Sequence, residues 1–163
     1  MVIRGENLML FLQKDGGFKS IAYATNHSLN INLSSTETSN KDQGTGTWST
    51  FEAGVLSWDV SSDNLFGTGT DMQGFGYSDL VDLMLNKNQI DVVFALEGDS
   101  TSFTVGSGKL DEVPEGGWKP KNEMPYYSGK AIITSISLNA PNGDNASYSV
   151  SLQGCGALKK KTA

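Results

Sequence analysis

The chain has one cysteine and one histidine among its 163 residues, and this scarcity excludes several kinds of site. Cys155 alone cannot form an internal disulfide, and neither a CxxC motif nor a structural zinc site can be built from it. His27 has no nucleophile motif near it in the sequence, although a triad could still assemble in space. His27 is therefore expected to be a structural residue at the start of a strand or in a turn. The sequence therefore predicts no metal, no cofactor and no enzyme.

Long hydrophobic runs are also absent. The apolar run at residues 8–12 is too short for the core of a signal peptide, and nothing in the sequence approaches the length of a membrane span. We therefore expect a protein that is made in the cytoplasm and does not contact membranes.

Positive charge is scarce as well. The sequence has 12 Lys and Arg against 18 Asp and Glu, a net charge of −6. Three of these lysines stand together at residues 159–161, so the rest of the chain has 9 against 18. Such a surface repels phosphate, which argues against a protein that grips nucleic acid but not against one that lets it pass. The basic tail at residues 159–163 is assigned no role.

Uncharged polar residues take the place of charge. Hydrophobic residues make up 37% of the chain and charged residues 18%, so it can pack a core within one domain covering residues 1–163. Its wet surface must then consist largely of Ser, Thr and Asn.

The strand period recurs along the chain. Residues 28–34 alternate as a half-buried strand with Leu29, Ile31 and Leu33 on one face. Residues 18–25 are expected to pair with this strand, with the break at Asn26 and His27. Residues 132–139 and 146–153 alternate in the same way and are joined by a turn-forming sequence, which predicts a hairpin. In the first strand of this hairpin we expect Ile132, Thr134, Ile136 and Leu138 on one face. In the second strand we expect Ala146, Tyr148, Val150 and Leu152 on one face. Residues 90–97 are continuously apolar and predict a strand covered on both faces.

One helix is predicted. Ser78 or Asp79 caps a segment in which Leu80, Leu83 and Met84 share a face, and Lys87 lies in the last turn. Residues 98–128 hold three of the four prolines and read as a long loop, which is assigned no role. The fold class predicted is mainly antiparallel β, a sandwich or barrel with one flanking α-helix.

The stretch KDQGTGTW carries a lysine and two glycines, as phosphate-binding loops do. Lys41 precedes Gly44 and Gly46 instead of following them, and residues 47–51 are β-prone instead of helical. The stretch is therefore interpreted as a polar loop that leads into a strand.

The polar faces of the predicted strands lack full charges. Exposed sheets and their edges usually carry lysine, proline or inward charge, which prevent pairing between molecules. Here the polar positions are hydroxyls and amides: Ser28, Asn30, Asn32, Ser34, Ser135, Ser137, Asn139, Ser147, Ser149, Ser151 and Gln153. Such a face is either buried in satisfied hydrogen bonds or is wet and must not hold a charged polymer. The unprotected edges favour copies that join edge to edge into a closed ring with a polar interior.

Four stretches between residues 21 and 158 stand out in order: IAYATNHSLNINLSSTETSNKDQGTGTW, SWDVSSDNLF, YSDLVDLML and YSGKAIITSISLNAPNGDNASYSVSLQGCGAL. In this combination and order, the sequence resembles the major tail protein (tail tube protein) family of long-tailed bacteriophages. Residues 98–128 match nothing in the family pattern. The resemblance implies a tail-tube-type β-sandwich or barrel, hexameric rings stacked into a tube, and a lumen through which the genome passes.

The resemblance also implies roles for particular residues. Residues 35–48 match the loop that contacts the neighbouring ring, which assigns this contact to Lys41, Asp42, Gly44, Gly46 and Trp48. The lumen or tube wall would be lined by hydroxyl and amide residues: Ser28, Asn30, Asn32, Ser135, Ser137, Asn139, Ser147, Ser149 and Ser151. The implied partners are other copies of the chain and the terminator, tape measure and baseplate hub proteins of a virion tail assembled in the host cytoplasm, with DNA passing through unbound.

Two other functions stay open at this point. A carbohydrate-binding β module could stack sugars on its aromatic residues, which are Trp48, Trp58, Trp118, Tyr126 and Tyr127, although tryptophan in small β domains more often packs in a core. A hydrolase that uses dispersed acids is the third reading, and no constellation of residues favours it.

Overall fold

The structure is a computed structural model that describes residues 5, 8–14, 17–42, 48–67, 74–98, 119–120 and 126–161. Residues 43–47 of the predicted loop lie outside this part of the chain. So do residues 99–118 and 121–125, which make up most of the long predicted loop at residues 98–128.

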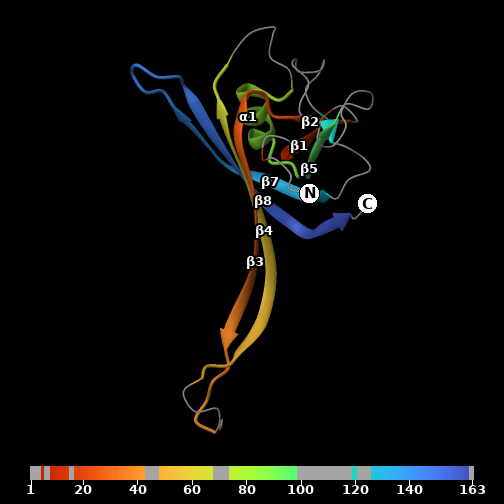
Figure 1. The fold of residues 1–163 in the computed structure, drawn as a ribbon, viewed down its shortest axis with the longest axis vertical. Helices are drawn as coiled ribbons and strands as arrows, with labels where there is room; N and C mark the ends of the chain where they lie inside the picture. Colours follow the sequence, from red (N-terminus) through yellow and green to blue (C-terminus); the bar gives the residue numbers. More distant parts are fainter. Residues whose placement is uncertain are drawn as a thin grey trace.

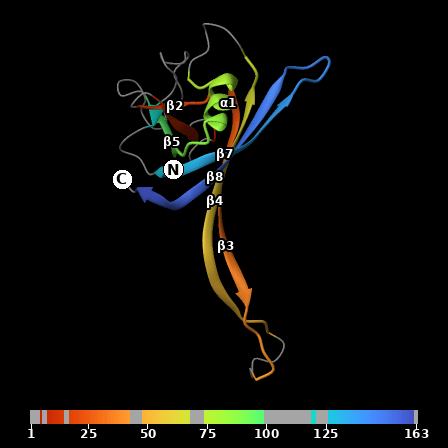
Figure 2. The same ribbon diagram turned by 180° about the vertical axis from the view of Figure 1, so that it is seen from behind.

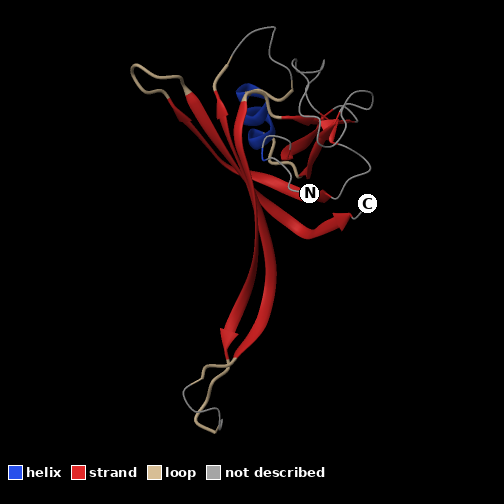
Figure 3. Ribbon diagram, viewed as in Figure 1, coloured by secondary structure: helices blue, strands red, loops and turns tan. Residues whose placement is uncertain are grey.

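A single antiparallel sheet dominates the fold (Figure 3). Its strands run in the order β2-β1-β5-β7-β8-β4-β3, and β6 pairs with β5 beside this path. The elements are β1 (Leu8–Lys14), β2 (Gly17–Ser20), β3 (Ala24–Glu37), β4 (Phe51–Leu65), α1 (Tyr77–Leu85), β5 (Ile90–Gly98), β6 (Lys119–Pro120), β7 (Tyr126–Asn139) and β8 (Ser147–Lys161). The predicted fold class, mainly antiparallel β, is confirmed, and α1 is the one helix within the described residues.

The molecule has a body and an arm. The body consists of β1, β2, β5 and α1 together with the first half of β7 and the second half of β8 (Figure 1). The arm is the outer part of the β3–β4 hairpin, residues 30–42 and 48–57, and it projects away from the body in both views (Figure 2). The arm therefore makes its own hydrogen-bonded ladder but has little of the chain packed against it.

Two apolar clusters hold the body together. The larger one joins β1, β4, β5, β8 and α1 through residues such as Leu12, Val60 and Leu80. The smaller one lies on the other side of β1 and β5 and contains Phe11 and Val93. Since β5 contributes to both clusters, the prediction that both of its faces are covered is confirmed.

The predicted β7–β8 hairpin is confirmed, but its first strand departs from simple alternation. Tyr148, Val150 and Leu152 are buried, as expected for β8. On β7 the register shifts between Ile133 and Ser135. This bulge places Ile133 in the core, whereas Thr134 is exposed and Ile132 lies opposite Gln153. The expectation that Ile132 and Thr134 share the inner face with Ile136 and Leu138 was wrong for this reason.

The predicted partner of β3 was also wrong. Residues 17–20 form β2 and pair with β1, and β3 pairs with β4 along its whole length. Strand β3 continues through Asn26 and His27, so the chain breaks earlier, near Tyr23, whose φ is 54°. The apolar run at residues 8–12 forms most of β1. Strand β1, and not β3, is therefore the partner of residues 17–20.

Helix α1 forms where it was predicted, with a different start. Gly76 is the N-cap instead of Ser78 or Asp79, and its N–H donates to Asp79 Oδ2 at 3.1 Å. Lys87 lies beyond the last turn with φ at 57°. Leu80, Leu83 and Met84 pack against the larger cluster, so the predicted inner face is confirmed.

Candidate assembly surface

The register of β3, β4, β8 and β7 brings the predicted polar residues onto one face. Directly opposite residues in antiparallel strands share a face. Ser28 lies opposite Ser61, Ser61 opposite Ser151, and Ser151 opposite Ser135, so one row of hydroxyls crosses all four strands. We call this the polar face; its members are Asn26, Ser28, Asn30, Asn32, Ser57, Asp59, Ser61, Asp63, Ser135, Ser137, Asn139, Ser147, Ser149, Ser151 and Gln153. Leu65 and Ile132 lie at its ends.

Two carboxylates on β4 belong to this face, and the sequence interpretation missed them. Asn30 Nδ2 donates to Asp59 Oδ2 at 3.0 Å, and Asn32 Nδ2 donates to Asp59 Oδ1 at 3.4 Å. Ser149 Oγ donates to Asp63 Oδ1 at 2.7 Å from the other neighbouring strand. The alternation of Trp58 and Val60 with Asp59, Ser61 and Asp63 could have identified them, because it has the strand period. The face is therefore not free of charge as predicted; it is negative, with no lysine or arginine among its members.

The opposite face of the same strands is apolar and only partly covered. Near the body, Leu29, Val60 and Leu152 belong to the larger cluster or pack against it. On the arm, Leu33 lies opposite Leu56, and Glu37, on the same face as Leu33, lies opposite Phe51. We call Ile31, Leu33, Phe51 and Leu56 the apolar stripe; they are 55%, 55%, 62% and 70% exposed. The prediction of a half-buried strand therefore holds at Leu29 and fails within this chain at Ile31 and Leu33.

This four-stranded part of the sheet is open at both edges. Strand β3 pairs with β4 on one side and has no strand partner on the other among the described residues. Strand β7 pairs with β5 only through its first half, up to Ala131, so residues 132–139 also leave one edge open there. Unpaired N–H and C=O groups along such edges are templates for another strand.

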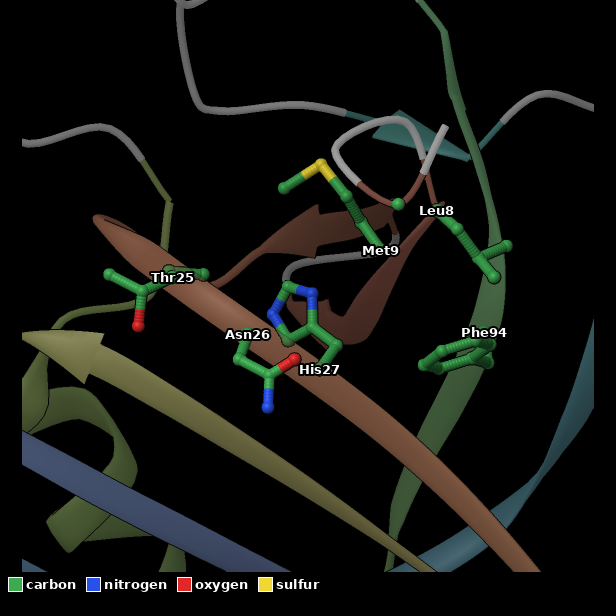
Figure 4. Close-up of a pocket in the computed structure, with 8 residues that line it drawn as sticks. Leu8, Met9, Thr25, Asn26, His27 and Phe94 are labelled. Atoms are coloured by element: carbon green, nitrogen blue, oxygen red, sulfur yellow. The ribbon is translucent and has the colours of Figure 1, made fainter. Parts of the chain in front are cut away.

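The single histidine lies at the base of β3, beside a cavity of about 390 Å³ (Figure 4). The N–H of Leu10 donates to His27 Nδ1 at 3.4 Å, which links β1 to β3. The cavity is lined by the apolar side chains of Leu8, Met9 and Phe94 and by the polar residues Thr25, Asn26 and His27. Its described lining contains no carboxylate, lysine or cysteine. The position of His27 near the start of a strand is as predicted.

The loop predicted to contact a neighbouring ring lies at the end of the arm. Lys41, Asp42 and Trp48 are exposed there, Trp48 to 81%, and Gly44 and Gly46 lie outside the described residues. Hydrogen bonds between residues 38–39 and Thr50 close the base of the loop. Thr38 N–H donates to Thr50 O and Thr50 N–H donates to Ser39 Oγ, both at 2.8 Å.

The aromatic residues considered for sugar stacking do not form one surface. Trp58 is 3% exposed, and its Nε1–H donates to Gly156 O at 3.0 Å, so its ring is part of the core. Trp48 lies at the end of the arm, and Trp118 lies outside the described residues.

Within the described ranges, no three His, Cys, Asp or Glu side chains gather as ligands for a metal ion. In the same part of the chain, no helix has the length and apolar character needed to cross a bilayer.

No protein-family model matches the sequence, and no curated protein matches it. The fold does match solved structures over 99% of this chain. A chain from the tail of an empty gene transfer agent particle, refined with helical C6 symmetry, is 18% identical, is covered completely and has a TM-score of 0.69. The SPP1 tail tube protein is 16% identical, with 80% of it covered and a TM-score of 0.62. A chain from the sheath–tube complex of the extracellular contractile injection system PVC is 14% identical, with 93% covered and a TM-score of 0.58. Because these matches span nearly the whole chain, the protein has the fold of tail tube proteins, and the resemblance found in its sequence is confirmed at the level of the fold.

Proposed function

We propose that the chain is a structural, non-enzymatic subunit of a phage tail tube, in which hexameric rings stack and the genome passes through the lumen. The observation that carries the proposal is the four-stranded sheet of β3, β4, β8 and β7, which has one polar face, one apolar face and two open edges. A solitary protein rarely leaves edges of this length open, because they invite pairing with other chains.

The directions of the strands fit a closed ring. Each neighbour in the series β3, β4, β8 and β7 is antiparallel, so β3 and β7 run in opposite directions. A copy related by rotation about the ring axis would therefore place its β7 edge, residues 132–139, antiparallel to the β3 edge of the next copy. This head-to-tail contact leaves no free edge when the rotation closes. The C6 symmetry of the matched gene transfer agent tail supports six copies.

The two faces decide which side lines the lumen. The body packs on the apolar face through residues such as Leu12, Leu80 and Val92, so that face points outward. The polar face then points inward and includes Ser28, Asn30, Asn32, Ser135, Ser137, Asn139, Ser147, Ser149 and Ser151. Asp59 and Asp63 add two negative charges per copy. A wet lumen with no cation at these positions would repel DNA and let it slide without binding.

The arm and its loop would provide the contact between rings. Lys41, Asp42 and Trp48 lie at the far end of the arm, which reaches beyond the body (Figure 1). We assign ring-to-ring contact to residues 35–48, including Gly44 and Gly46. Terminator, tape measure and baseplate hub proteins are the partners proposed at the ends of the tube, which would be assembled in the host cytoplasm and belong to the virion tail.

Imaging the purified protein tests this function. Negative-stain electron microscopy and native mass spectrometry should detect rings or tubes at high protein concentration. A protein that stays monomeric throughout would contradict the proposal.

A loop variant tests the contact between rings. Replacing residues 41–46 by a short turn should leave rings but shorten the tubes. Tubes of normal length would show that the loop does not form the ring-to-ring contact.

A further inference from the structure

The tip of the β7–β8 hairpin carries a dipeptide with chemistry of its own. Residues 140–146 join the last ladder pair, Asn139 with Ser147, and the tip projects away from the body in both views (Figures 1 and 2). Residues 140–145 are exposed. Asn142 is followed by Gly143 in this loop, and no other asparagine in the sequence precedes a glycine.

An asparagine before a glycine is placed to react with its own backbone. The backbone nitrogen of the second residue attacks the side-chain carbonyl carbon of the asparagine, and a side chain on that second residue hinders the approach. Glycine hinders it least, because it has no Cβ. Gly143 lies in a turn with φ at 87°, and a Cβ built on it would meet no atom within 4 Å. The attacking nitrogen therefore lies in open space.

The fold holds other asparagines in place but does not hold Asn142. Among the described residues, neither the Asn142 amide nor the Gly143 N–H forms a hydrogen bond. By contrast, Asn30 Nδ2 donates to Asp59 Oδ2 at 3.0 Å within a strand, and Asn64 is only 1% exposed. The side chain of Asn142 can therefore turn toward the Gly143 nitrogen without breaking any contact.

We propose that Asn142 and Gly143 form a self-modifying site, at which Asn142 is converted to aspartate and isoaspartate without an enzyme. The Gly143 nitrogen loses its proton to solvent and bonds to Asn142 Cγ. The bond from Cγ to Nδ2 then breaks, and ammonia leaves a cyclic succinimide behind. Water opens this ring by breaking either the new bond, which gives aspartate, or the original peptide bond, which gives isoaspartate. The net reaction consumes water and releases ammonia, and it needs no oxidant or reductant.

The conversion changes the charge of the tip and leaves the ladder intact. It adds one negative charge to a chain of net charge −6, two residues from Asp144 in a loop that contains no lysine or arginine. Isoaspartate also adds one carbon to the main chain. The exposed loop absorbs this carbon, because its ends stay fixed by the pair of Asn139 with Ser147. If the chain serves in a virion tail as proposed, its copies are not replaced, and the added charge accumulates with the age of the particle.

Incubating the purified full-length protein in mildly alkaline buffer tests the site. Peptide mass spectrometry should find the conversion at Asn142, and an isoaspartate-specific methyltransferase should label the same peptide. Because the loop is exposed and unbonded, the rate in the folded protein should lie within about threefold of the rate in concentrated urea. Asn30 should stay unconverted in the folded sample. Conversion of Asn142 in urea but not in the folded protein would overturn the inference, because the fold would then protect the site.

Two variants complete the test. Gly143→Ala should slow the conversion at least roughly tenfold, because its Cβ crowds the attacking nitrogen, and an unchanged rate would overturn the mechanism. Asn142→Asp carries one product from the start and should unfold at the same urea concentration as the wild type. A lower midpoint would contradict the expectation that the ladder is unaffected. These measurements use dissociated subunits, so their outcome does not depend on whether the chain forms tubes.

Discussion

Gly154 on β8 is a position where one added methyl group should destabilise the subunit. A Cβ built on Gly154 meets the indole of the buried Trp58, lying 2.5 Å from its Nε1. Gly129 on the neighbouring strand β7 leaves room for the same ring, because a Cβ there would lie 2.6 Å from Trp58 Cζ2. The indole cannot move aside without losing the hydrogen bond from its Nε1–H to Gly156 O. The indole of Trp58 therefore lies over two neighbouring strands at positions that leave room for it because both carry glycine.

Gly154→Ala should lower the free energy of unfolding by about 2–4 kcal/mol. Overpacking a core costs about 1–3 kcal/mol, and a lost hydrogen bond adds about 1 kcal/mol. For a chain of this length, each kcal/mol corresponds to a drop in the melting temperature of about 2–4 °C. Thermal and urea unfolding of dissociated subunits, followed by tryptophan fluorescence, measure the effect.

Gly67→Ala is the matched control for this prediction. A Cβ there would lie 2.6 Å from the ring of Tyr23, which is a similar overlap as long as the ring does not move. Tyr23 is 48% exposed, so its ring can turn away into solvent. The control should cost less than about 1 kcal/mol. Equal stability losses in the two variants, or an unchanged unfolding midpoint for Gly154→Ala, would refute the reasoning that Trp58 is confined.

Two further predictions concern buried polar groups. Burial raises the pKa of Tyr148 to about 12, and the carboxylate of Asp79 adds to the rise. The folded state therefore keeps a proton that the unfolded state loses above about pH 10, so stability should fall between about pH 10 and 12, by up to roughly 2.5 kcal/mol. Urea titrations at pH 9 and 11.5 should show a smaller fall for Tyr148→Phe, and an identical fall would contradict the assignment. Asn64→Ala should cost about 1–3 kcal/mol, because Ser62 Oγ donates to Asn64 Oδ1 at 2.7 Å in a buried site and would lose this acceptor. Ser62→Ala with Asn64→Ala should recover part of the loss, and a double variant less stable than the single one would refute this pairing.

The elements with a clear period were predictable from the sequence. Strand β3, the β7–β8 hairpin and the inner face of α1 each repeat with the spacing of their secondary structure, and the burial of Tyr148, Val150 and Leu152 follows from it. Strand β5 could be assigned as doubly covered because its run is continuously apolar. These features depend on local sequence, which periodicity reports well.

The missed features depend on contacts between distant segments. Strand β1 has a short apolar run with no alternation, so nothing local marks its pairing with β2 and β5. The bulge near Thr134 shifts the inner face by one residue, and Gly76 caps α1 through a side chain three residues later. The partner of β3 was missed although β4 is the next strand in the chain, because residues 38–50 separate the two strands.

Burial patterns carry a different kind of information from pairing. Leu29, Ile31 and Leu33 alternate identically on β3, yet only Leu29 packs against the core of its own chain. Alternation records that a face is to be covered, not which molecule covers it. Ser62 and Asn64 are the converse case, polar residues on the covered face of β4 that are buried because they bond to each other. Where alternation predicts burial and the single chain leaves the apolar stripe exposed, we expect another molecule to cover it. Where polar residues are buried, as Ser62 and Asn64 are, they form hydrogen bonds with each other. Only the first kind of discrepancy, an exposed apolar face, occurs on the arm.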